Sequence, residues 1–208
     1  MQQLVLKDLL LQRKLVVLYL AYAFFLLLIN FNNDALLTIC CMTIPFIGTI
    51  VSVGHEVKNE SEIILNSLPF QREEIVIAKY ILASILIVIG IILSFLIGLI
   101  QHQLGTLDMN GMMMWGAMLG GIVGAILYVS IALPIGFGMG HISSKYIALF
   151  VGTIFAFSSG MIVKNLWMNV ENQWSSSLFV NAILLTGIFL IYVASMVLSV
   201  SLYKERDL

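Results

Sequence analysis

The sequence predicts an all-α integral membrane protein with six transmembrane helices. Of its 208 residues 61% are hydrophobic, only 10% are Asp, Glu, Lys or Arg, and the hydrophobic residues gather in long runs. Soluble domains carry about 25% charged residues, and a run of about 18 apolar residues can cross the hydrocarbon core as a helix. The runs lie near 15–31, 35–53, 80–101, 112–134, 146–163 and 178–202. They leave no room for a soluble domain, so residues 1–208 are expected to form one transmembrane domain.

Residues 1–14 precede the first run and have an amphipathic pattern. One helical face carries Val5, Leu6, Leu9 and Leu10, and the other carries Lys7, Asp8, Gln12 and Lys14. This pattern is typical of a short interfacial helix lying among lipid headgroups. Basic residues before an apolar run also occur in signal peptides. Because Ala21 and Ala23 lie inside the run and five further runs follow, an uncleaved first span is expected.

The distribution of Lys and Arg predicts the orientation in the membrane. With the N-terminus in the cytoplasm, nine of the ten basic residues are cytoplasmic, and only Lys164 lies outside. The nine are Lys7, Arg13, Lys14, Lys58, Arg72, Lys79, Lys145, Lys204 and Arg206. Cytoplasmic loops of membrane proteins carry such an excess. Both termini are therefore expected in the cytoplasm.

The apolar runs offer no pattern for chemistry. Cys40 and Cys41 are adjacent, so they point about 100° apart on a helix and form neither a mutual disulfide nor a metal site. The three histidines, His55, His102 and His141, lie on different connectors. No Asp, Glu, Lys or Arg lies inside the six apolar cores, which disfavours a carrier with its own proton site. Neither a metal site nor a catalytic residue is predicted.

The fourth run contains Gly116, Gly120 and Gly124 at four-residue intervals. Small residues on one face allow a second helix to approach closely in lipid. The partner is either another helix of this chain or a second subunit.

On the outer side, Trp167 and Trp174 are seven residues apart and share one helical face. Tryptophan is enriched at membrane interfaces. The pair is expected to form either an interfacial belt or an outer gate.

A charged connector, 55–79, separates the second and third runs. Pro69 is expected to end the helix that continues from the second run, because proline lacks an N–H and disfavours helix in the residue before it. Glu73 and Glu74 suit the positive end of a new helix. That helix is expected to run unbroken from about Arg72 to Ile100. The connector then forms a helical elbow in the cytoplasm.

The elbow is unusually apolar for a solvated hairpin. Its apolar residues include Ile63, Ile64, Leu65, Leu68 and Phe70. An exposed patch of this kind commonly marks a partner site, although the elbow can also pack against the inner ends of neighbouring spans. Anionic lipid attracts basic clusters, whereas carboxylates outnumber basic residues here, so lipid binding is disfavoured.

The stretch "LNSLPFQREEIVIAKY", preceded by Glu60, resembles the cytoplasmic signature of bacterial ABC-2 type permeases, commonly E...LLSLPxSRxEIVxxKY. The six spans and the amphipathic start are also similar to short members of that family. The resemblance implies that the elbow docks into a separately encoded ATPase. Residues that would make or position this dock are Glu56, Glu60, Ile64, Leu65, Leu68, Pro69, Arg72, Glu73, Glu74 and Lys79. One departure is Gln71, because the family often has serine there, a good helix cap.

The resemblance further implies a permease subunit of a bacterial ABC exporter in the cytoplasmic membrane. Two permeases, identical or paralogous, would pair with two ATPases, which bind ATP and Mg, so this chain is expected to hold no cofactor and to be no enzyme. Membrane lipid surrounds it, and no nucleic acid is expected. The cargo would be hydrophobic or amphipathic, such as an antimicrobial or toxin peptide, giving antimicrobial resistance. A non-transporting immunity or sensor subunit is the alternative, whereas a CAAX-type protease is disfavoured because Glu73-Glu74 lacks the required arginine.

Overall fold

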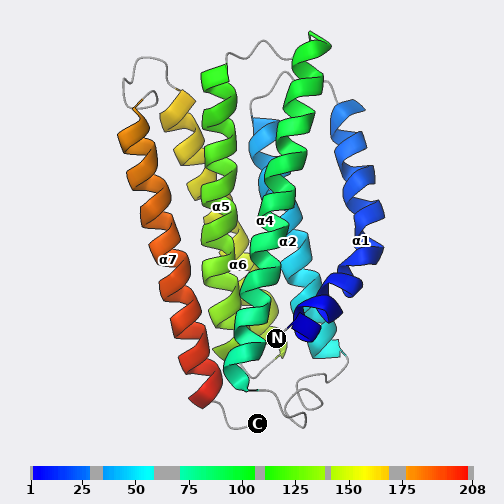
Figure 1. Ribbon diagram of the computed structural model, residues 1–208, viewed down its shortest axis with the longest axis vertical. Helices are drawn as coiled ribbons and strands as arrows, with labels where there is room; N and C mark the ends of the chain where they lie inside the picture. The colour runs from blue at the N-terminus through cyan, green and yellow to red at the C-terminus, as the bar shows by residue number, and fades with distance from the viewer. Residues whose placement is uncertain are drawn as a thin grey trace.

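The structure is a computed structural model that describes residues 2–28, 35–58, 71–105, 111–138, 142–168 and 177–205. All regular secondary structure in these residues is helical, and the helices run side by side in an elongated bundle (Figure 1). The helices are α1 (Gln2–Leu28), α2 (Ala35–Lys58), α4 (Arg72–Gln103), α5 (Gly111–Gly138), α6 (Ile142–Met168) and α7 (Leu178–Glu205). The predicted all-helical class is confirmed for the described residues.

Five of the helices, α2, α4, α5, α6 and α7, are long and apolar enough to cross a membrane. Helix α1 differs because it bends by 54° between its parts Gln3–Leu10 and Leu15–Leu26. The two parts are long and apolar enough to cross a membrane only when they are counted together. The described chain therefore has five candidate spans, or six if the bent helix is counted as one.

The first part of α1 packs differently from the predicted interfacial helix. Asp8 and Gln12, expected on the water-facing side, are buried. Leu6 and Leu10, expected on the apolar side, are each 57% exposed. The bend explains this difference, because it lays the segment across the end of the bundle, where polar groups of α2 and α4 satisfy its polar face. The amphipathic pattern thus does not show which side chains are buried, and the interfacial position of this segment stays a prediction.

Helix α5 forms the centre of the bundle and packs against α6, α2 and α7. Of its apolar stretch 72% is buried, compared with 17% for that of α7. The main core cluster joins α5 to the lower parts of α4 and α7 through side chains such as Val76, Val129, Phe137 and Tyr203. This cluster fixes the position of the start of α4.

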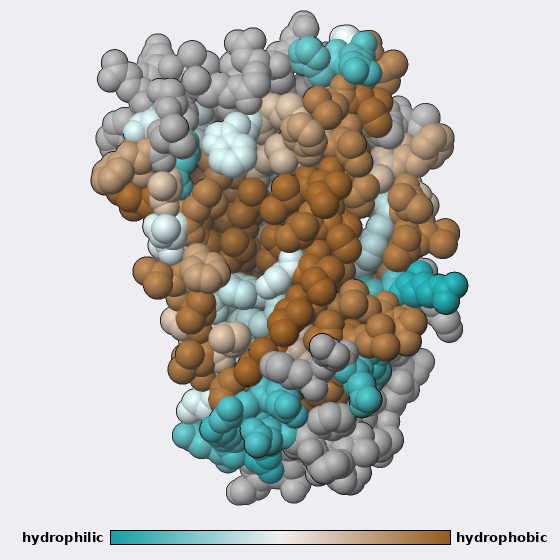
Figure 2. All heavy atoms as spheres, viewed as in Figure 1, coloured by the Kyte–Doolittle hydropathy of each residue, from teal (hydrophilic) through white to brown (hydrophobic). Residues whose placement is uncertain are grey.

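The outer surface of the bundle is apolar along most of its length. Large exposed hydrophobic residues lie on α1, α4, α6 and α7, among them Phe24, Phe95, Phe150, Phe179 and Phe189. Figure 2 shows the resulting broad hydrophobic band, with hydrophilic residues at the two ends of the molecule. Such a band suits contact with lipid chains, and it supports a multi-pass membrane protein.

Two prolines lie inside helices, Pro45 in α2 and Pro134 in α5. Proline cannot donate to the carbonyl four residues earlier, so a membrane helix needs another donor there. For Pro134 that carbonyl belongs to Ser130, and the hydroxyl of Ser195 on α7 donates to it at 2.7 Å. A side chain of α7 therefore replaces the missing backbone donor of α5.

Candidate functional site

The predicted start of the long third-span helix is confirmed. Helix α4 begins at Arg72 and continues without a break to Gln103, about 48 Å at 1.5 Å per residue. Glu73 and Glu74 lie in its first turn, where the helix dipole favours negative charge. Gln71 occupies the N-cap position in an extended conformation but makes no side-chain capping bond, as its poor capping tendency predicts.

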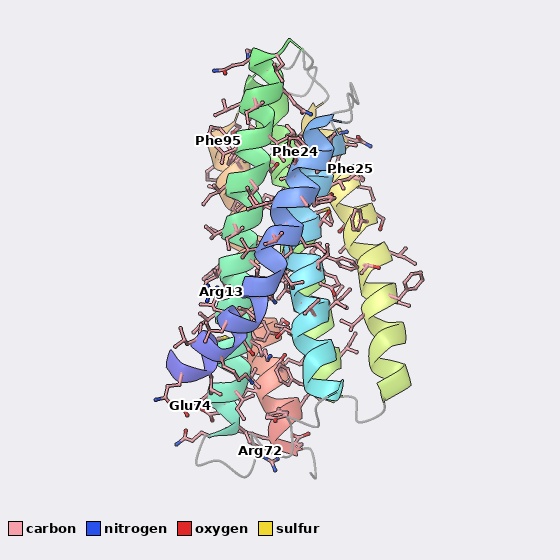
Figure 3. The ribbon with its side chains drawn as sticks, turned by 90° about the vertical axis from the view of Figure 1, so that its right-hand side faces the viewer. Arg13, Phe24, Phe25, Arg72, Glu74 and Phe95 are labelled. Atoms are coloured by element: carbon pink, nitrogen blue, oxygen red, sulfur yellow. The ribbon has the colours of Figure 1, made fainter. Side chains whose placement is uncertain are left out.

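Arg72 connects the start of α4 to the end of α7. Its Nη1 donates to the backbone carbonyl oxygens of Tyr203 at 3.2 Å and of Lys204 at 2.9 Å. The side chain of Lys204 also forms an ion pair with Glu73. Figure 3 shows Arg72 where the red end of α7 reaches the first turn of α4. Of the predicted docking residues, Arg72 and Glu73 thus contact another helix of the same chain.

Lys79, the last predicted docking residue, is buried. Its Nζ lies 2.9 Å from Oδ2 of Asp8 on α1, and both side chains are at most 5% exposed. Nζ also donates to Oγ of Ser52 on α2 at 2.7 Å. Lys79 therefore joins α4 to α1 and α2. Its side chain can position a docking surface, but it does not form part of an exposed one.

A second polar contact holds α1 against α2. Gln12 Nε2 donates to the backbone carbonyl of Gly48 at 2.9 Å, and the hydroxyl of Tyr19 donates to Gln12 Oε1 at the same distance. Gln12 and Asp8 are one helical turn apart, so the two contacts lie along one face of α1. The sequence marks this face as polar but cannot show that it is buried.

The rest of the predicted elbow lies outside the described residues. This applies to Glu60, Ile64, Leu65, Leu68 and Pro69, and to the side chain of Glu56, whose backbone belongs to α2. Their part in docking stays a prediction. What the structure describes is where the elbow is attached, namely the end of α2 at Lys58 and the start of α4 at Arg72.

The glycine stripe packs inside this chain. A Cβ at Gly120 would lie 2.6 Å from the carbonyl oxygen of Gly160 on α6, and one at Gly124 would lie 3.0 Å from that of Ala156. Gly116 is buried on the same helix. The two backbones approach closely because α6 has its own small residues, Ala156 and Gly160, four positions apart. This favours the packing alternative over a subunit interface.

On the predicted outer side, Trp167 is half-buried, and its indole nitrogen donates to the Asn181 side chain on α7. Trp174 lies outside the described residues. The hydrogen bond ties α6 to α7 and leaves the belt and gate alternatives open.

A buried network of hydroxyl groups, absent from the sequence predictions, joins α4 to α7. The hydroxyl of Tyr80 lies 2.7 Å from Ser195 Oγ and 2.8 Å from Ser199 Oγ. The hydroxyl of Tyr192 donates to the backbone carbonyl of Tyr80 at 2.7 Å. In the sequence, the spacing of Tyr192, Ser195 and Ser199 along one helical face is the signal for this network.

The described residues contain no group of three or more His, Cys, Asp or Glu side chains that could hold a metal ion. Cys40 and Cys41 are buried and not joined in a disulfide. Within the described part of the chain, some polar side chains connect helices, such as Lys79 and Tyr80, and others bond back to their own helix, such as Thr49.

These features define a multi-pass helical membrane protein in which the helix after its long connector is tied to three neighbouring helices. A family model described as "ABC-2 family transporter protein" matches residues 3–204. The match covers nearly the whole chain, so the protein belongs to the ABC-2 family of transporter proteins. No curated protein and no solved structure matched.

Family membership makes the chain a membrane component of a transporter, which is generally non-catalytic. It also implies an ABC ATPase as partner and, in general, dimerisation.

Proposed function

We propose that the chain is the permease subunit of a bacterial ABC exporter whose connector between α2 and α4 docks the ATPase. The observation that carries the proposal is the bonding at the start of α4, directly after the connector. Arg72 bonds α7, and Lys79 bonds α1 and α2. A movement of the connector that displaces α4 would therefore also displace three other helices.

The geometry of α4 suggests how movement of the ATPases would reach the membrane. The helix is continuous for 32 residues, so it can transmit a push along its whole length. ATP binding would close two ATPases, and their motion would reach the membrane through the connector. This requires the N-in and C-in orientation predicted from the basic residues. In support, the start of α1 and the end of α7 lie at the same end of the bundle (Figure 1).

The proposed cargo is hydrophobic or amphipathic, such as an antimicrobial or toxin peptide. In α4, α5, α6 and α7, the charged residues whose side chains the structure describes lie within eight residues of a helix end, such as Lys79 in α4 and Lys164 in α6. Arg13 lies at the bend of α1. The middle of the described bundle contains hydroxyl groups instead, such as those of Tyr128 on α5 and Thr153 on α6. A path of this kind suits a substrate that needs no charged site. A second permease, identical or paralogous, would complete the path.

The first experiment tests docking. A tagged chain is purified from its native host and the copurifying ATPase is quantified. Leu65→Asp in the connector is expected to remove the ATPase. Leu104→Asp is the matched control, because Leu104 is 67% exposed at the opposite end of α4. Equal retention of the ATPase by both variants would contradict docking at the connector.

The second experiment separates an exporter from the non-transporting alternative. Efflux of a fluorescent amphipathic peptide is measured from cells with the intact pair and from cells with a hydrolysis-dead ATPase. Faster efflux with the intact pair is expected for an exporter. Equal efflux in a complex that still retains the ATPase would favour an immunity or sensor subunit.

A further inference from the structure

The last turn of α7 is held in place by a residue of another helix. The final four carbonyl groups of a helix have no partner within the helix. In α7, two of these carbonyl groups, those of Tyr203 and Lys204, accept hydrogen bonds from Arg72 Nη1. A guanidinium also suits the negative end of the helix dipole. Arg72 is therefore the C-terminal cap of α7, supplied by α4.

Two further contacts fix the same turn. Tyr203 is 1% exposed, and its ring packs edge-on against that of Phe137 at 5.2 Å between centroids. Lys204 extends to Glu73 on the first turn of α4. The beginning of α4 and the end of α7 therefore form one continuous surface at this end of the bundle, where Figure 2 shows hydrophilic residues.

The charges on this surface are divided unequally. The two basic groups, Arg72 and Lys204, are occupied by contacts within the chain. Glu74 and Glu205 have no ion-pair partner among the described residues, and Glu205 is exposed. Among the described residues of this surface, the carboxylates without an ion-pair partner are thus negative charges that a partner can contact. A basic surface on the partner would complement them.

We propose that the last turn of α7 forms part of the ATPase-docking surface, and that Arg72 is the positioning residue that holds it beside the connector. Glu205 and Glu74 face a basic region of the ATPase. This inference rests on the proposed function for the identity of the partner. It adds α7 to a dock that the sequence resemblance confines to the connector and the start of α4, and it changes Arg72 from a docking contact to a cap.

The positioning role is tested without the ATPase. Spin labels are placed at exposed positions 71 and 205 by Gln71→Cys and Glu205→Cys in a Cys40→Ala, Cys41→Ala background, and the distance distribution is measured. Arg72→Gln is expected to broaden it by about one helical turn, roughly 5 Å. Arg72→Lys is expected to keep it narrow, because an ammonium group still bonds helix-terminal carbonyls. An unchanged distribution in Arg72→Gln would overturn the capping role.

The docking role is tested with the complex that copurifies. Glu205→Lys is expected to weaken ATPase binding about tenfold, and more at low salt than at high salt. Gln103→Lys adds a positive charge at the exposed opposite end of α4 and is expected to leave binding unchanged. Equal binding by the two variants would remove α7 from the dock.

The remaining outcomes are also distinguishable. Loss of the ATPase in Arg72→Gln with an unchanged label distance would make Arg72 a direct contact and refute its positioning role. If the unmodified chain retains no ATPase, the proposed function fails and the partner assignment fails with it. The label experiment then still decides whether Arg72 caps α7.

Discussion

Replacing Lys79 by methionine is expected to destabilise the protein strongly, although the sequence places this residue beside a charged, cytoplasmic connector. Lys79 and Asp8 are at most 5% exposed, and their charged atoms lie 2.9 Å apart. Removing one partner of a buried ion pair costs about 3–5 kcal/mol, because the other charge stays buried. The bond to Ser52, worth about 1 kcal/mol, is lost as well. Among the described residues, the carboxylate of Asp8 then keeps an ion pair with Lys7, at 3.6 Å.

The assay is thermal unfolding in detergent, followed by circular dichroism. A change of 1 kcal/mol shifts the Tm of a chain of this size by about 2–4 °C, so a total loss of about 4–6 kcal/mol in Lys79→Met is expected to lower it by roughly 8–24 °C. Lys7→Met is the matched control. Its side chain is 43% exposed and lies farther from the same carboxylate, so the expected loss is below about 1 kcal/mol.

A double replacement separates charge from packing. Asp8→Leu combined with Lys79→Met removes both charges at similar volume, and this commonly restores stability. The double variant is therefore expected to unfold at a higher temperature than Lys79→Met alone. If Lys79→Met and Lys7→Met had the same Tm, the reasoning from the buried pair would be refuted.

Three further predictions concern helix contacts and helix ends. Gly120→Ala is expected to destabilise the protein by about 1–3 kcal/mol, because the new Cβ would lie 2.6 Å from a backbone oxygen of α6. Gly187→Ala is the control, because its Cβ would have no neighbour within 4 Å, and it is expected to stabilise the protein by about 0.5–1 kcal/mol. The unfolding temperatures of the two variants check both expectations. Gln71→Ser is expected to stabilise the start of α4 by about 1 kcal/mol through a capping bond, seen as slower hydrogen exchange in its first turn. Ser195→Ala leaves the carbonyl freed by Pro134 without its donor and is expected to cost about 1–3 kcal/mol, which lowers the Tm by roughly 2–12 °C. A higher Tm for Gly120→Ala, unchanged exchange in Gln71→Ser, or an unchanged Tm for Ser195→Ala would contradict the respective contact.

The sequence predicts the helices well because bilayer thickness and backbone hydrogen bonding leave few alternatives. The start of α4 at Arg72 follows from equally local causes, namely Pro69 and the acidic first turn. Local signals are less informative for α1. Its amphipathic pattern is present, but the pattern does not distinguish a face that meets water from a face that meets buried polar groups of other helices.

The partners of charged residues are not predictable from the sequence alone. Asp8 and Lys79 are 71 positions apart, and Arg72 is 131 positions from Tyr203. No periodicity connects such residues, since the packing of α1 and α7 on α4 decides the contacts. The glycine stripe is an intermediate case. Ala156 and Gly160 repeat the four-residue spacing of Gly120 and Gly124, and comparing the two helices would have indicated their close packing.

The resemblance to a docking signature and the contacts in the structure assign different tasks to the same charges. The docking signature by itself suggests that Arg72 and Lys79 contact the ATPase. In the folded chain, one caps α7 and the other neutralises a buried carboxylate of α1. Both tasks require a cation at a fixed distance from the connector. Under the proposed function, ATPase binding then depends on the apolar residues of the connector and on the carboxylates of Glu74 and Glu205. Arg72 and Lys79 transmit the movement of α4 to the neighbouring helices.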